Sequence, residues 1–173
     1  MNKFLNINYL KTGSSRQQQA FKEIKDLGIF KKLQQYDPLL AGTIPIGIDI
    51  ATSDLDIICY CEDHLEFSNL LQKTFGDQDD FQISTKINEG YKVTIANFNG
   101  VNFPIEIFGQ NIPSKEQNAF RHMLIEYKIL KEKDSIFIEK IITLKKTGLK
   151  TEPAFAKLLG IKGNPYKELL KYD

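Results

Sequence analysis

Two short stretches carry the residue types that could do chemistry: Gly42-Thr43 and Asp54-Leu55-Asp56. Each adjoins an apolar run, which indicates a strand, a loop over residues 44–53 and a second strand. Side chains alternate between the faces of a strand, so both aspartates are expected on one face. Neighbouring carboxylates favour a cation between them, and hard oxygen ligands suit magnesium, calcium or manganese.

The glycine and the threonine before the loop suit phosphate binding. Without a Cβ at Gly42 a phosphate can approach the backbone closely, and Thr43 can donate its hydroxyl and its amide to phosphate oxygens. Asp49, inside the loop, is an alternative acidic ligand. The residues therefore predict a phosphate and metal site, and the competing interpretation is a solvated acidic strand.

The same residues resemble the signature of the DNA polymerase β-like nucleotidyltransferase superfamily: glycine followed by serine or glycine, a short spacer, then Asp-x-Asp or Asp-x-Glu. Thr43 departs from the commoner serine but keeps the hydroxyl. The resemblance implies a third acidic residue on a later strand, for which Glu106 is the candidate. A wider resemblance, to a small bacterial branch known only as a domain of unknown function, rests on Gly42–Ile46, Glu106–Gln110, Gln117–Ala119 and Lys150–Phe155.

The resemblance implies an enzyme, a metal-dependent nucleotidyltransferase that moves a nucleoside monophosphate from a nucleoside triphosphate to an acceptor. Asp54, Asp56 and Glu106 would be its catalytic residues and would hold Mg²⁺, or alternatively Mn²⁺. Gly42 and Thr43 would cradle the phosphates.

Further contacts are expected around this centre. Ser53 is a supporting phosphate ligand. The resemblance also implies that Arg121 and Lys128, on a predicted helix after the Glu106 strand, are candidate triphosphate contacts. The alternative for that pair is a solvated helix face. His122 is either a general base or a structural histidine, and Lys150 lies in a loop that can reach the site.

Other functions stay open beside this one. The chain can be a non-catalytic nucleotide- or metal-binding module, a protein-interaction module of the same fold, or a phosphohydrolase that uses the same carboxylates. The acceptor is a small molecule, a protein or an RNA end. Arg16 is expected to be solvated rather than to contact phosphate.

The expected fold class is α+β, with a nucleotidyltransferase-like mixed or antiparallel sheet and flanking helices. Residues 1–112 would form the core and residues 113–173 a helical part packed on it, unless residues 1–173 form one domain. Turn signals at Asn88-Glu89-Gly90 and Asn99-Gly100 predict three antiparallel strands between residues 81 and 110. Helices are expected over residues 14–35 with a break at Gly28, over 65–75, from a capping box at Ser114 and Gln117, over 135–146, from 153 and from 164.

Composition narrows the choice of partners. The chain has 173 residues, 42% of them hydrophobic, and a net charge of +1. Three Lys but twelve Asp or Glu lie between residues 37 and 114, which argues against a protein that grips duplex nucleic acid. No apolar run approaches the roughly 20 residues of a membrane span, so a cytoplasmic location is expected. The two cysteines, Cys59 and Cys61, are expected in the core.

Overall fold

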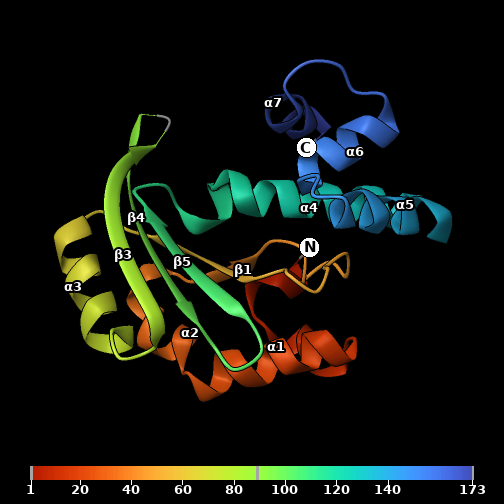
Figure 1. Ribbon diagram of the computed structural model, residues 1–173. Coiled ribbons are helices and arrows are strands. Elements are labelled where there is room, and N and C mark those ends of the chain that lie inside the picture. The colour runs from red at the N-terminus through yellow and green to blue at the C-terminus, as the bar shows by residue number, and fades with distance from the viewer. Residues whose placement is uncertain (1, 89, 173) are drawn as a thin grey trace.

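The computed structural model describes residues 2–88 and 90–172, so Glu89 of the predicted turn lies outside the described residues. The helices and strands are shown in Figure 1. The strands are β1 Leu39–Ala41, β2 Leu55–Tyr60, β3 Asp79–Asn88, β4 Tyr91–Asn99 and β5 Pro104–Gln110. The helices are α1 Ser15–Asp26, α2 Ile29–Lys32, α3 His64–Phe75, α4 Asn118–Glu132, α5 Ser135–Lys146, α6 Thr151–Leu159 and α7 Pro165–Leu169.

The five strands form one mixed sheet in the order β1-β2-β5-β4-β3. Strand β2 pairs antiparallel with β1 and parallel with β5, whereas β5, β4 and β3 are antiparallel to one another. Pro104 is the first residue of the central strand β5, a position where a missing N–H does not interrupt the ladder. The predicted α+β class with a mixed sheet is confirmed.

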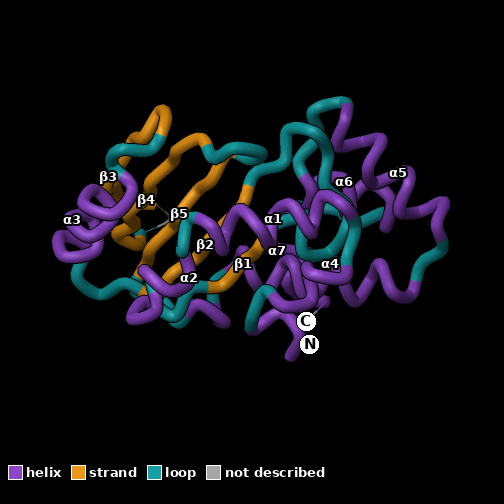
Figure 2. Tube along the Cα trace, turned by 90° about the horizontal axis from the view of Figure 1, so that it is seen from below, coloured by secondary structure: helices purple, strands orange, loops and turns teal. Residues whose placement is uncertain are grey.

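The two faces of the sheet are covered by different helices (Figures 1 and 2). Helices α1, α2 and α3 pack on one face, where Ile57 and Cys59 of β2 belong to the main apolar cluster. Helix α4 packs on the other face, where Phe120 and Met123 meet Ile58 of β2. The opposite side of α4 packs against α5, α6 and α7. Alternation along β2 therefore puts the aspartates on the α4 face and Cys59 in the core behind them.

Local signals account for the start and end of the first helix. The Ser14 side chain accepts a hydrogen bond from the Gln17 backbone and the Gln17 side chain caps in return, which is the predicted capping box. Gly28 has φ 67°, in the left-handed region that glycine adopts without a steric penalty, and it separates α1 from α2 as expected. Within the described residues, no helix is both long and apolar enough to cross a membrane.

The predicted capping box before α4 is wrong. Helix α4 begins at Asn118, and Gln117, its N-cap residue, makes no side-chain cap hydrogen bond. The Ser114 hydroxyl instead donates to the Asp37 carbonyl at 2.6 Å, and the Gln117 amide donates to the carbonyls of Cys59 and Ile112 at 2.9 Å each. Both side chains are buried, so tertiary contacts outcompete the local cap and attach the start of α4 to β2.

Arg16 is not solvated as expected but holds the loop between β1 and β2. Its Nε lies 3.0 Å from Asp49 Oδ2, and its guanidinium donates to the carbonyls of Ala51 and Ser53 at 3.1 and 3.2 Å. The guanidinium carbon also lies 4.5 Å from the centre of the Phe103 ring. Asp49, the alternative acidic ligand, is thus engaged in an ion pair.

We expect Arg16→Ala to lower the free energy of unfolding by about 2 kcal/mol, because it removes these bonds and leaves the mostly buried Asp49 carboxylate unpaired. The measurement is urea unfolding followed by circular dichroism. Lys22→Ala is the matched control, since Lys22 pairs only with Asp26 of the same helix at the surface and such pairs contribute little. Equal stability of the two variants would contradict this role for Arg16.

Candidate active site

Three carboxylates converge on the α4 face of the sheet. Asp56 of β2 and Glu106 of β5 are register partners in parallel strands, so their side chains leave the sheet side by side. Asp54 immediately precedes β2. In the described part of the chain, none of the three carboxylates takes part in a hydrogen bond or an ion pair with another residue. Lys150 partly offsets the charge of Asp56 and Glu106 without a direct contact, and Lys86 also partly offsets that of Glu106.

The surroundings disfavour ionisation of two of these carboxylates. Burial, followed by the charges of Asp54 and Glu106, raises the pKa of Asp56 to about 7, against an opposing effect of Lys150. Burial and the charge of Asp54 likewise raise the pKa of Glu106. Clustered acids with raised pKa values are typical of functional sites, and a divalent cation would reverse both effects.

Gly42 directly backs the central carboxylate. Its φ is 79°, and a Cβ at this position would lie 2.0 Å from Asp56 Oδ2. Ala41, the preceding residue, is the register partner of Asp56 across β1 and β2. The sequence motif suggested a glycine that admits phosphate; the structure adds that this glycine leaves the space which the Asp56 carboxylate fills.

The hydroxyls of the loop ends meet beside the carboxylates. Ser53 Oγ accepts a hydrogen bond from the Ile50 backbone at 2.9 Å and lies 3.3 Å from Thr43 Oγ1. Ser53 is buried and Thr43 is partly exposed. The contact closes the loop over residues 44–52 and brings the two predicted phosphate ligands to one place.

One cavity of about 580 Å³ contains most of the predicted site. Its lining includes all six residues predicted from the motif and its third acid: Gly42, Thr43, Ser53, Asp54, Asp56 and Glu106. A second cavity of about 470 Å³ continues from the same carboxylates along β5 and shares Asp56, Glu106 and Ala119 with the first. Asp56 and Glu106 thus line both cavities, whereas Asp54 lines the larger one.

Arg121 and Lys128 are not among the residues that line either cavity. Helix α4 instead presents Ala119, His122 and Glu126 to the larger one, a set spaced by three and four residues. At 100° per residue, positions 121 and 128 lie about a quarter turn or more from that face. The structure therefore does not bring this predicted pair to the carboxylates.

Lysines from the C-terminal helices line the larger cavity instead: Lys145, Lys146 and Lys150. Lys150 was expected near the site, whereas the other two were missed. Lys145 is buried, its Nζ donates to the Ile48 carbonyl at 2.7 Å, and burial lowers its pKa to about 8. The sequence signal for Lys145 and Lys146 was their position in the last turn of α5. Basic residues are common at helix C-termini, so this signal does not point to a site.

The sequence of the chain matches one protein family. The model of that family, described as a domain of unknown function (DUF4269), matches residues 22–172. No curated protein matches the sequence.

Solved structures share the fold at low identity. A structure of the Cid1 poly(U) polymerase with Mg 3′-dATP has a TM-score of 0.56 and 12% identity, and covers 90% of this chain and 48% of its own. A structure described for the RNA terminal uridylyl transferase activity of Cid1 has a TM-score of 0.55 and 11% identity, over 76% and 41%. The GLD-2/RNP-8 complex has a TM-score of 0.53 and 14% identity, over 82% and 56%. This chain thus spans about half the length of those proteins and has a nucleotidyltransferase-like fold.

Proposed function

The chain belongs to the DUF4269 family, a domain of unknown function, and we propose that it is a metal-dependent nucleotidyltransferase. The observation that carries the proposal is the convergence of Asp54, Asp56 and Glu106 with the Gly42-Thr43 turn in one cavity. The likeness of its fold to nucleotidyltransferase structures supports the same reaction class. The reaction is transfer of a nucleoside monophosphate from a nucleoside triphosphate to an acceptor hydroxyl, which loses its proton while pyrophosphate leaves.

The donor atoms fit hard divalent cations. Asp54, Asp56 and Glu106 offer only carboxylate oxygens, the ligands that Mg²⁺ and Mn²⁺ prefer, and no neighbouring group neutralises them fully. These residues would hold the metal. Bound there, the metal would supply charge neutralisation at the phosphates and at the attacking oxygen.

The remaining residues would position the triphosphate. Thr43 would donate its hydroxyl and amide to phosphate oxygens, with Ser53 fixing the Thr43 hydroxyl. Lys146 and Lys150 line the same cavity and would balance the phosphate charge. Enzymes accelerate phosphoryl transfer largely through such positioning and charge stabilisation. Arg121 and Lys128, outside the cavity lining, are not part of this proposal.

The acceptor would approach from the smaller cavity, because Asp56 and Glu106 line that space as well. A small molecule, a protein side chain or an RNA end would each present a hydroxyl there. The Cid1 structures are described for RNA terminal uridylyl transfer, so we take a short RNA with a free 3′ hydroxyl as the first acceptor to test.

The test has two stages, thermal unfolding with each nucleoside triphosphate and then transfer of label from an α-labelled triphosphate. In wild type, a ligand at a hundredfold excess over its Kd would raise Tm by roughly 5–11 °C when Mg²⁺ is present. Asp54→Asn should remove the Mg²⁺-dependent part of the shift and reduce transfer by at least about 100-fold. Glu62→Gln is the matched control, since Glu62 follows the same strand but does not line the cavity.

The outcomes separate the competing functions. A Mg²⁺-dependent Tm shift with no labelled product across small-molecule, protein and RNA acceptors would favour a non-catalytic binding module. Release of phosphate or pyrophosphate without a labelled acceptor would favour a phosphohydrolase. An Asp54→Asn protein that binds and transfers like wild type would overturn the proposed site.

A further inference from the structure

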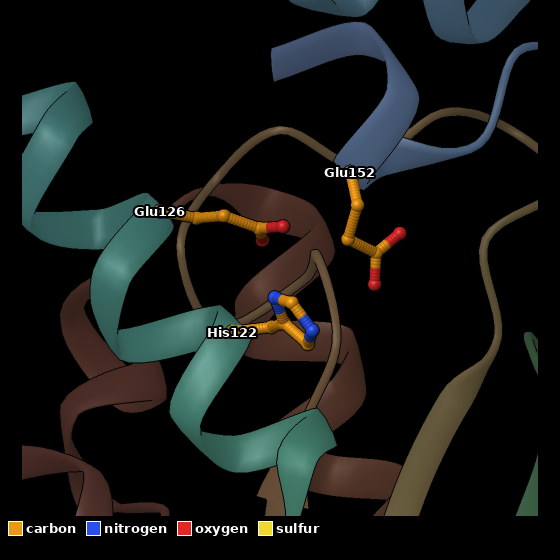
Figure 3. A group of neighbouring side chains, drawn as sticks. All are labelled: His122, Glu126 and Glu152. Atoms are coloured by element: carbon orange, nitrogen blue, oxygen red, sulfur yellow. The ribbon is translucent and has the colours of Figure 1, made fainter. Parts of the chain in front are cut away.

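A second group of metal-ligating side chains comes from helices α4 and α6 and lines the same cavity as the three sheet carboxylates. His122 and Glu126 are four residues apart on α4 and therefore share one face of the helix, and Glu152 comes from the first turn of α6. One ligand atom from each lies within 4.8 Å of the others. Figure 3 shows the three side chains pointing toward a common space.

Two of these side chains are buried, and each has a polar atom that forms no hydrogen bond with the described residues. His122 is 6% exposed and Glu126 3% exposed. Among residues 2–88 and 90–172, neither His122 Nδ1 nor Glu126 Oε1 finds a hydrogen-bond partner. A buried polar atom without a partner destabilises the fold, and both of these atoms belong to residues of the group. A bound cation would satisfy both at once.

The nearby lysine does not explain these atoms. Lys145 is close enough to lower the pKa of Glu126. Its hydrogen bond goes to the Ile48 carbonyl, however, and in the part of the chain that the structure describes Glu126 Oε1 accepts none. Burial lowers the pKa of His122, which favours the neutral imidazole that binds metals. Burial, followed by the charge of Glu152, raises the pKa of Glu126 well above its usual value, and a cation bound there would favour the ionised carboxylate.

The donor set indicates the class of ion. One imidazole nitrogen with two carboxylate oxygens suits Zn²⁺ and other first-row transition ions better than Mg²⁺, which prefers oxygen ligands only. All three residues line the 580 Å³ cavity, so an ion can enter from that space and keep a coordination position toward it. The oxygen-only centre and this group therefore differ in the metal that they would select.

We propose that His122, Glu126 and Glu152 form a binding site for a divalent first-row transition ion, separate from the carboxylate centre on the sheet. The ion joins α4 to the first turn of α6. The site does not depend on the proposed transfer reaction, because its ligands and its test involve neither nucleotide nor acceptor.

Co²⁺ is the probe, because its visible absorption reports binding to protein ligands. The full chain, stripped of metal with a chelator, is titrated with Co²⁺ alone and followed by absorption and calorimetry. To exclude binding to the sheet carboxylates, the titration is repeated in Asp54→Asn/Asp56→Asn, where we expect about one Co²⁺ per chain to remain. Adding Glu152→Gln to that variant should weaken Co²⁺ binding by about 100-fold or more.

His122→Ala should have the same effect as Glu152→Gln. His64→Gln is the matched control: His64 is the other histidine of the chain, buried on α3 beside Thr94 and Cys61. This control should bind Co²⁺ like its parent. Circular dichroism shows whether each variant folds. If His122→Ala does not fold, the test rests on Glu152→Gln, because Glu152 is less buried and lies at the start of a helix.

The proposal is overturned by any of three results. These are no Co²⁺ binding in wild type, loss of all binding in Asp54→Asn/Asp56→Asn, and unchanged binding in both His122→Ala and Glu152→Gln. Failure of nucleotide transfer would leave these readouts unaffected, so the two proposals fail separately.

Discussion

Gly42→Ala is expected to reduce nucleotide transfer by at least about 100-fold, more than its loss of stability explains. The new Cβ would lie 2.0 Å from Asp56 Oδ2, far inside van der Waals contact. The oxygen is at the end of a side chain, so the carboxylate can turn away instead of unfolding the strand. In the proposed reaction, an Asp56 carboxylate displaced by about an ångström would no longer hold metal and phosphate in line.

Gly47→Ala separates this effect from backbone strain. Gly42 and Gly47 have nearly equal φ angles, 79° and 74°, in the region that costs an L-residue about 1–2 kcal/mol. A Cβ on Gly47 meets nothing within 4 Å. Both variants should therefore lose similar stability in urea unfolding, whereas only Gly42→Ala should lose transfer and the Mg²⁺-dependent nucleotide shift. Equal transfer by the two variants would show that the Gly42–Asp56 contact has no functional role.

Asp56→Asn is expected to stabilise the metal-free protein while it abolishes transfer. The residues that shift the pKa of Asp56 are Asp54, Glu106 and Glu152, which raise it together with burial, and Lys150, which lowers it. Near pH 8 Asp56 is therefore ionised in surroundings that disfavour its negative charge, and this lowers the stability of the folded state. The asparagine keeps the shape without the charge, so the free energy of unfolding at pH 8 should rise by about 1–3 kcal/mol.

The pH dependence has a defined sign. The folded protein keeps the proton on Asp56 up to its pKa of about 7, whereas the ordinary value is 3.8. The folded state thus binds more protons between about pH 4 and 7, and the contribution of Asp56 to stability falls as the pH rises through this window. The stabilisation by Asp56→Asn should consequently be small at pH 4 and complete above pH 7.

The measurement is urea unfolding of wild type and Asp56→Asn at pH 4, 6 and 8, with a chelator present and then with Mg²⁺. Mg²⁺ should raise the stability of wild type and reduce or reverse the advantage of the variant, because a bound cation favours the ionised carboxylate. A variant less stable than wild type at pH 8 in chelator would refute the charge argument. A Mg²⁺ effect of equal size in both proteins would place the cation elsewhere.

Local patterns in the sequence determined the helices, the strands and the carboxylates of the proposed site. Alternation along residues 54–60 was enough to separate the aspartates from Cys59, because strand geometry has a period of two whatever surrounds it. Gly28 and the Ser14 cap marked the first helix for equally local reasons. The mixed sheet with flanking helices followed from these elements and from the resemblance carried by Gly42, Thr43 and Glu106.

The basic side of the cavity was decided by tertiary structure. Arg121 and Lys128 were predicted from their position after the Glu106 strand, yet packing on the sheet and on the C-terminal helices orients α4 so that neither residue lines the cavity. Lys145 and Lys146 reach it because α5 and α6 fold back on α4. The local periodicity of the sequence does not predict that α5 and α6 pack back against α4.

The sequence by itself thus determined the strands and most helix ends, because these follow from residues within about ten positions of one another. It also determined six residues that share one cavity, because the motif and its third acid identify them. Only the tertiary structure decided that Gly42 makes room for Asp56, that Arg16 holds the loop, and that Glu152 meets His122. These contacts join residues 14 to 37 positions apart. Their geometry depends on how whole elements pack, which residue types and spacing do not specify.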